Sequence, residues 1–130
     1  MRTRLSTLLL AATLAAPCLS ALTPGAARAS EFKQYFLVLL RAGPNRGGTP
    51  EEIERIQRGH MDNIQRLVSA GKLAIAGPFE DGGELRGLFI FDVPTKGEVE
   101  TLLAGDPAIQ TGRLKPQILT WWSERGRALP

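Results

Sequence analysis

The chain is poor in the residues that build metal and disulfide sites. It has one cysteine, Cys18, and one histidine, His60, among 130 residues. A zinc site needs several Cys or His ligands, and a disulfide needs a second cysteine. A P-loop, a dinucleotide glycine fingerprint after a strand and a Gly-x-Ser-x-Gly elbow are also missing. The sequence therefore shows no motif for nucleotide binding, flavin binding, hydrolase activity or a conventional zinc site.

Clusters of basic residues are missing as well. The formal net charge is +3, but Arg2, Arg4 and Arg28 lie in the first thirty positions, which hold no Asp or Glu. The rest of the chain keeps 13 of the 16 basic residues against 13 acidic ones and is formally neutral. A nucleic-acid surface needs clustered Lys and Arg to neutralise several phosphates. The sequence therefore argues against a nucleic-acid partner.

The N-terminal segment has the pattern of an export signal. Arg2 and Arg4 precede an uncharged apolar stretch from Leu8 to Leu22, which is short for a bilayer crossing. Ala27 and Ala29 then supply small residues at the two positions that a signal peptidase recognises.

From this pattern we predict a cleavable signal over residues 1–29 and a single domain over residues 30–130. The mature protein would be periplasmic or secreted, without stable membrane association. It would also contain no cysteine and would depend on packing alone. The alternatives are a lipoprotein anchored at Cys18 and an uncleaved membrane anchor.

Apolar runs and turn signals predict four strands and two main helices in this domain. We expect strands over Tyr35–Leu40, Leu73–Phe79, Leu85–Asp92 and Leu114–Trp122, helices from Thr49 to about Ala70 and from Thr95 to Gly105, and one further turn from Asp106 to about Thr111. Strand, helix, strand, strand, helix, strand is the order of a ferredoxin-like α+β fold. Its four-stranded antiparallel sheet has the first and third strands in the centre and both helices on one face. Pro116 has no backbone N–H to donate to a neighbouring strand, which favours a strand at the edge of the sheet.

The first helix carries a start signal and an apolar stripe. Thr49, Pro50 and Glu52 suit the N-cap, the first helical position and a capping box, and Gly71 suits a left-handed C-terminal cap. The expected buried stripe consists of Ile53, Ile56, Met61, Ile64, Leu67 and Val68.

The two central strands are apolar on both faces, although the helices can cover only one. A strand with one face in the core and the other in solvent normally alternates apolar and polar residues. We therefore predict a homodimer that forms through the sheet faces. The alternative is that the tail from Ser123 to Pro130 covers the second face.

His60 is the first candidate for chemistry because it falls within the apolar stripe of the first helix. A lone histidine there is more often a structural hydrogen-bonding residue than a catalyst. An imidazole can nevertheless move protons near neutral pH when a carboxylate fixes its tautomer. Asp106 is the candidate carboxylate, although an Asp before a Pro also caps a helix without any other role.

Further residues are candidates for a substrate pocket. Gly77 and Pro78 could let a ligand approach the backbone, and they could equally well only end a strand. Arg41 and Arg46 flank a glycine-rich loop and could hold an anion, although loop arginines are usually only solvated. Trp121 and Trp122 point to opposite faces of the last strand, so one can pack in the core while the other, taken as Trp122, lines a pocket or the dimer interface.

A family resemblance rests on a set of short motifs. These are Gly59-His60-Met61-Asp62-Asn63-Ile64, then Leu67, Gly71-Lys72-Leu73, Gly77-Pro78, Gly87, Asp106-Pro107, Gly112 and a terminal Trp. From Tyr35 to Trp122 the chain resembles the YciI-like (YCII-related) domain family. The resemblance implies a ferredoxin-like fold that dimerises as a dimeric α/β-barrel, with His60 and Asp106 as the active-site pair.

The resemblance also implies a kind of chemistry. The family's rare assigned reactions are proton transfers without metal or organic cofactor, such as loss of HCl from a chlorinated hydroxyquinone. We therefore expect a lyase or isomerase that acts on a small cyclic or aromatic carbonyl compound and uses no cofactor. The alternatives are a non-catalytic module that binds a small ligand and, because related barrels include haem enzymes, a haem protein with His60 as axial ligand.

Overall fold

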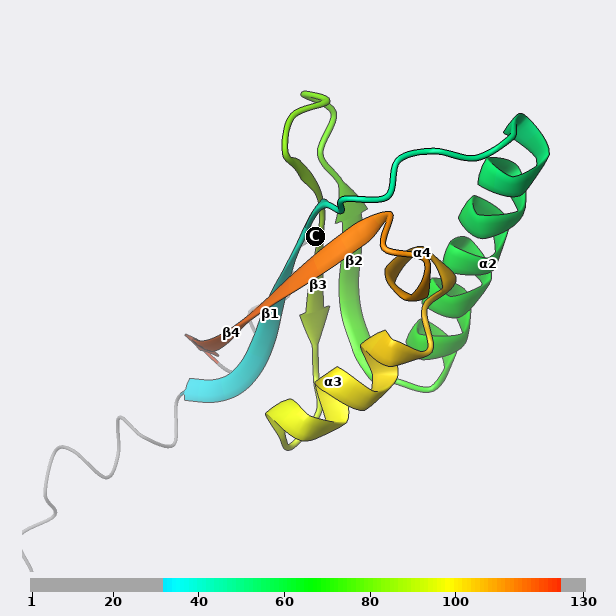
Figure 1. The fold of residues 1–130 in the computed structure, drawn as a ribbon. Helices are drawn as coiled ribbons and strands as arrows, with labels where there is room; N and C mark the ends of the chain where they lie inside the picture. The colour runs from blue at the N-terminus through cyan, green and yellow to red at the C-terminus, as the bar shows by residue number, and fades with distance from the viewer. Residues whose placement is uncertain (1–31, 125–130) are drawn as a thin grey trace, which may run out of the picture.

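The fold is taken from a computed structural model of the chain, of which residues 32–124 are described (Figure 1). Its elements are β1 (Phe32–Ala42), α2 (Pro50–Ser69), β2 (Leu73–Pro78), β3 (Leu85–Phe91), α3 (Lys96–Ala104), α4 (Pro107–Gln110) and β4 (Leu114–Glu124). The predicted export signal over residues 1–29 and the last residues, 125–130, lie outside this described part. Within it, none of the helices combines the length and the hydropathy that a bilayer crossing requires.

The strands form one antiparallel sheet in the order β2-β3-β1-β4. This confirms the predicted ferredoxin-like α+β fold, with β1 and β3 in the centre. β4 lies at an edge, where the missing N–H of Pro116 is tolerated. The helices α2, α3 and α4 all lie on the same side of the sheet (Figure 1).

The ends of α2 form as the sequence predicts. Thr49 Oγ1 accepts from the Glu52 backbone N at 3.2 Å, and Glu52 Oε2 accepts from the Thr49 backbone N at 2.9 Å. This reciprocal capping box satisfies two donors that a helix start leaves free. After the helix, Gly71 has a φ of 68°, a left-handed conformation that glycine adopts without strain.

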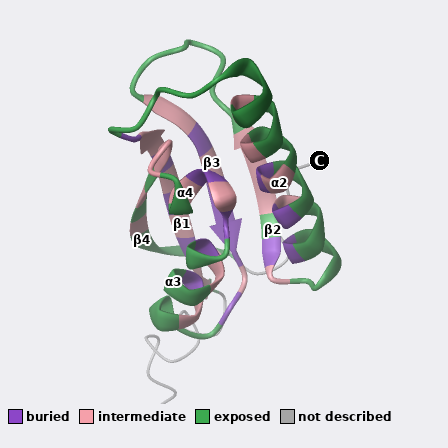
Figure 2. Cartoon of the chain, turned by 45° about the vertical axis from the view of Figure 1, so that its right-hand side comes forward, coloured by how far each residue is buried: buried purple, intermediate pink, exposed green. Residues whose placement is uncertain are grey.

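The core lies between the helices and one face of the sheet. In β1 the side chains of Phe36, Val38 and Leu40 are buried on this helix side, and the residues between them are only half-buried. Phe89 and Leu67 pack into the same cluster from β3 and α2. Figure 2 shows the buried positions of α2 on the side turned toward the sheet.

The predicted stripe of α2 needs a correction. Met61 and Val68 are 45% and 46% exposed, whereas the helix buries His60, Asn63 and Leu67. These three positions are separated by three and four residues and share one face of the helix. Met61 and Val68 each lie one position further along, about 100° around the axis, so they lie beside the buried face and stay partly exposed.

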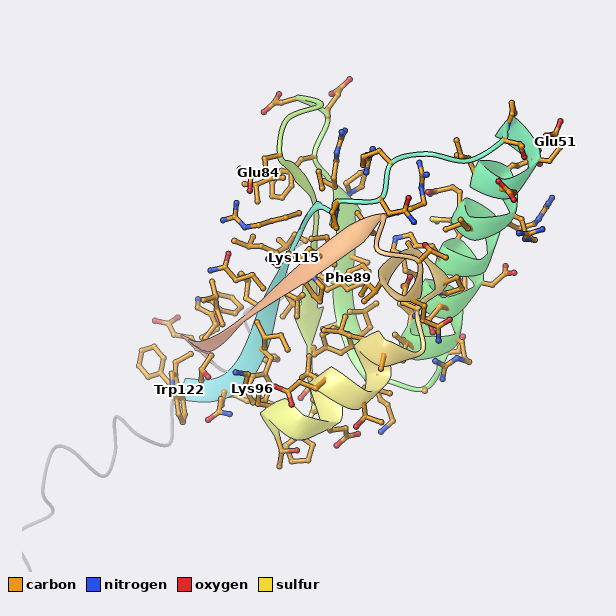
Figure 3. All side chains as sticks on the ribbon, viewed as in Figure 1. Glu51, Glu84, Phe89, Lys96, Lys115 and Trp122 are labelled. Atoms are coloured by element: carbon orange, nitrogen blue, oxygen red, sulfur yellow. The ribbon has the colours of Figure 1, made fainter. Side chains whose placement is uncertain are left out.

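The expectation that one tryptophan packs in the core is wrong. Trp121 is 39% exposed and Trp122 is 56% exposed. They do point to opposite faces, since Trp121 pairs with Tyr35 and Trp122 with Gln34. Both lie at the far end of β4, where Figure 3 shows Trp122 well away from Phe89 and the helix-covered core. The Trp121 ring packs against Tyr35 instead, with centroids 5.9 Å apart.

Candidate active site

His60 and Asp106 lie in direct contact, although 46 residues separate them. The Nδ1 atom of His60 is 2.9 Å from Asp106 Oδ1 and 2.8 Å from Oδ2. The Asp106 side chain is 0% exposed and the His60 side chain is 10% exposed. The two residues that the sequence marked as candidates therefore form one buried pair.

A glycine allows this contact. Gly59 lies next to His60 in α2, and a Cβ on Gly59 would come within 2.9 Å of the Pro107 ring at the start of α4. Real Cβ atoms do not approach a ring that closely, so only glycine lets α4 pack this near to α2. Asp106 is the N-cap of α4 and directly precedes Pro107. The close approach of the two helices therefore brings the carboxyl group to the histidine.

Asp106 accepts hydrogen bonds from three different groups. Oδ1 accepts from the backbone N of Ala108 at 2.9 Å, which is the helix cap, and Oδ2 accepts from Asn63 Nδ2 at 3.1 Å. His60 is the third donor. Arg66 Nη2 in turn donates to Asn63 Oδ1 at 2.6 Å and fixes that amide. Such a network holds the carboxyl group in one orientation.

These partners also assign the histidine tautomer. A backbone N–H and an amide NH₂ can only donate, so both oxygens of Asp106 act as acceptors toward them. With both oxygens accepting, we assign the His60 proton to Nδ1, which donates it to Asp106. Its other ring nitrogen, Nε2, has no hydrogen-bond partner within residues 32–124 and is not among their buried unpaired atoms. Nε2 is therefore free to accept a proton.

His60 lines a cavity of about 530 Å³ between α2 and the sheet. Its apolar wall is formed by Leu40, Ile56, Ile64, Phe89 and Leu114. The His60 ring lies nearly parallel to Phe89, at 22° and 6.0 Å between centroids. The volume suits a small organic molecule, since ligand pockets usually measure about 300–1,000 Å³.

Some of the other predicted pocket residues line the cavity, and some do not. Gly77, Pro78 and Arg46 line the cavity together with His60. Arg41 does not, because it lies on the opposite face of the sheet, where it donates to Gln117 and Glu84 at 3.0 Å each. Trp122 does not line it either, because it lies at the far end of β4. For Arg41 and Trp122 the expectation of a pocket position is therefore corrected.

Sequence reasoning missed four residues of this site. Asn63 could have been found, because it lies three residues after His60 on the same helix face. No sequence signal marks Arg66, Arg86 or Arg113, because the sequence does not distinguish an arginine of a site from one that is only solvated. Over residues 32–124, no three His, Cys, Asp or Glu side chains are grouped so that they could hold a metal ion.

The comparison with protein families decides the identity. The sequence profile of the YCII-related domain matches residues 34–122, most of the chain. The chain belongs to the YCII-related family. Among curated protein sequences, none matches it.

Two solved structures are similar to this YCII-related chain. One is the 5-chloro-2-hydroxyhydroquinone dehydrochlorinase TftG from Burkholderia phenoliruptrix AC1100, in complex with 2,5-dihydroxybenzoquinone. It is 19% identical, with a TM-score of 0.50 over 67% of this chain and 92% of that one. The other, At3g17210 from Arabidopsis thaliana, is 18% identical, with a TM-score of 0.36 over 73% and 99% of the two chains. The likeness to TftG supports the assigned fold.

Proposed function

We propose that this protein is a lyase or isomerase that uses His60 for acid–base chemistry on a small cyclic or aromatic carbonyl compound. In this proposal His60 is the general base, and Asp106 orients its ring. The observation that carries the proposal is the geometry of His60, which donates through Nδ1 to a fixed carboxyl group and presents Nε2 at an accessible cavity. No metal or organic cofactor takes part in the proposed reaction.

The proposed step begins with proton removal by His60. Nε2 accepts a proton from a C–H next to a carbonyl group or from a phenolic O–H, and the electron pair is delocalised onto oxygen. Asp106 accepts from Nδ1–H throughout and stabilises the imidazolium that forms. The electron pair then either expels a leaving group, which gives a lyase, or takes a proton back at another atom, which gives an isomerase.

Two findings support this class of reaction. The chain belongs to the YCII-related family. A solved structure with the same fold is named as a dehydrochlorinase and was determined with a quinone bound. A bound cyclic dicarbonyl compound in that protein is consistent with the substrate class proposed here.

Substitution of His60 tests the proposal. We would compare wild type, His60→Ala and His60→Gln for turnover of a panel of quinones, lactones and enol acids. We expect both variants to lose about 10²- to 10⁴-fold in kcat/KM, because a positioned general base contributes that much. Thermal unfolding of each variant would show that the fold is retained. Unchanged turnover in a folded His60→Gln protein would remove the catalytic role.

A non-catalytic ligand-binding module is the second candidate. The observation that favours it is that Asp106 also caps α4 through the backbone N of Ala108, which is a sufficient structural reason for a buried carboxyl group. The same panel separates the two candidates. A binding module would retain one of these compounds without turnover, and His60→Gln would change its affinity only.

We also propose that the protein is a homodimer that forms through the sheet face opposite the helices. Leu37, Leu39 and Leu88 lie on this face in the centre of the sheet and are half-buried, and Leu119 at the edge is 41% exposed. Soluble monomers rarely expose a large contiguous apolar patch. Light scattering should give a dimer for wild type and a monomer for Leu119→Glu. A wild-type monomer at micromolar concentration would contradict the proposal.

The alternative that the C-terminal tail covers this face concerns residues 125–130, which lie outside the described part.

Export is the last part of the proposal, and the sequence of residues 1–29 supports it. Sequencing the N-terminus of the protein recovered from a periplasmic fraction should begin at Ser30. A cytoplasmic protein that begins at residue 1 would contradict it.

A further inference from the structure

The cavity beside His60 is lined by three arginines and by no acidic residue. Arg46, Arg86 and Arg113 come from the loop after β1, from β3 and from the turn before β4. None of the three forms a salt bridge within residues 32–124. Asp106, which contacts His60, is fully buried and is not among the residues that line the cavity. The cavity therefore has an uncompensated positive charge.

Two of these arginines are fixed by the backbone of the neighbouring segment. Arg46 Nη1 donates to the carbonyl oxygen of Arg113 at 3.1 Å, and Arg113 Nη1 donates to those of Arg46 and Gly47 at 3.2 and 2.9 Å. A Cβ on Gly43 would come within 2.0 Å of the Gly112 carbonyl oxygen, so glycine is needed where the two segments touch. These bonds use one nitrogen of each guanidinium and leave the others available to a ligand.

The third arginine, Arg86, is directed by an irregularity in the sheet. Leu40 pairs with Gly87 and Arg41 pairs with Leu85, so Arg86 has no opposite residue on β1. Such a bulge changes the direction of a side chain. Arg86 lines the cavity on the helix side, and its Nε is a buried atom without any hydrogen-bond partner within residues 32–124. A buried donor without a partner suggests that a ligand completes its hydrogen bonds.

We propose that this cavity binds the carboxylate group of a cyclic or aromatic substrate, with Arg86 as its main partner and Arg46 and Arg113 beside it. A guanidinium presents parallel N–H donors that match the two oxygens of a carboxylate. The apolar wall that includes Ile56 and Phe89 then accepts the ring. Since His60 lines the same cavity, the bound ring has its reacting position near Nε2. The assignment of a reacting position rests on the proposed function, whereas the carboxylate site does not.

A pair of probes that differ only in charge tests the site. We would measure, by calorimetry on the purified protein, the binding of 2,5-dihydroxybenzoate and of its neutral amide, 2,5-dihydroxybenzamide. We expect the carboxylate to bind at least tenfold more tightly, and we expect this preference to disappear in Arg86→Gln. Arg55→Gln is the matched control, because Arg55 is an exposed arginine of α2 outside the cavity lining. Its carboxylate preference should equal that of wild type.

Each outcome decides the proposal. Equal affinities of the two probes for wild type, or no binding of the carboxylate, would overturn it without need of any variant. A full preference in folded Arg86→Gln, or tighter binding of inorganic phosphate than of the carboxylate, would overturn it as well. His60→Gln distinguishes this site from the proposed reaction: it should keep the carboxylate preference and lose turnover. Retained turnover with a retained preference would contradict only the reaction.

Discussion

Two groups of polar side chains lie next to the same cavity, and they differ in whether the protein itself satisfies their hydrogen bonds. Both carboxyl oxygens of Asp106 accept hydrogen bonds from protein donors, and the carboxyl group is fully buried. Around Arg86 the donors lack partners among the described residues. The carboxyl group is therefore satisfied without a ligand and contributes to stability. The second group is incomplete and is available for recognition, so substitutions in the two groups should have different effects.

Asp106→Ala should give the largest loss of stability. It would leave His60 Nδ1, Asn63 Nδ2 and the Ala108 backbone N without their acceptor. Since each unsatisfied buried donor costs about 1–3 kcal/mol, we expect a loss of at least about 3 kcal/mol in the free energy of unfolding. Urea unfolding would measure it. A loss below about 1 kcal/mol would contradict a structural role of this network.

Gly59→Ala should give an intermediate loss. The new methyl group would meet the Pro107 ring, and moving α4 outward costs about 1–3 kcal/mol, as overpacking usually does. Because Asp106 moves with α4, we also expect a lower kcat. The control is Gly97→Ala in α3, where a Cβ meets nothing within 4 Å. That variant should gain about 0.5–1 kcal/mol, and an equal effect of both substitutions would refute the close-approach argument.

Arg86→Met should have the smallest effect on stability. The side chain loses no ion pair and no hydrogen bond within the described residues, so we expect a change of less than about 1 kcal/mol, of either sign. Urea unfolding of this variant beside Asp106→Ala tests the comparison directly. A loss for Arg86→Met as large as that for Asp106→Ala would mean that Arg86 is part of the structure and is not reserved for a ligand.

The sequence predicted the fold well because its signals are local. The capping box at Thr49 and Glu52, the left-handed Gly71 and the edge position of Pro116 depend only on neighbouring residues, and all appear in the structure. The tryptophans could not be placed in the same way. How far the helices extend over the sheet depends on tertiary packing, which no local signal shows.

The candidate site was only partly predictable, for the same reason. His60 stood out as the only histidine and Asp106 as a capping residue, but their contact depends on the packing of Gly59 against Pro107. The position of Arg86 depends on a bulge that the residue pattern along β3 does not reveal. Arg41 was preferred because it flanks a glycine-rich loop, whereas the pleat of β1 turns it to the other face.

The central claim is that His60 keeps its proton on Nδ1 and presents a bare Nε2 to the cavity. Because the chain has one histidine, ¹⁵N NMR of the labelled protein reports this ring without ambiguity. For the neutral ring we predict a protonated Nδ1 coupled to Asp106 and an unprotonated Nε2 whose signal shifts when 2,5-dihydroxybenzoate is added. A proton on Nε2 with a bare Nδ1, or an Nε2 signal that does not respond to the added compound, would contradict the account.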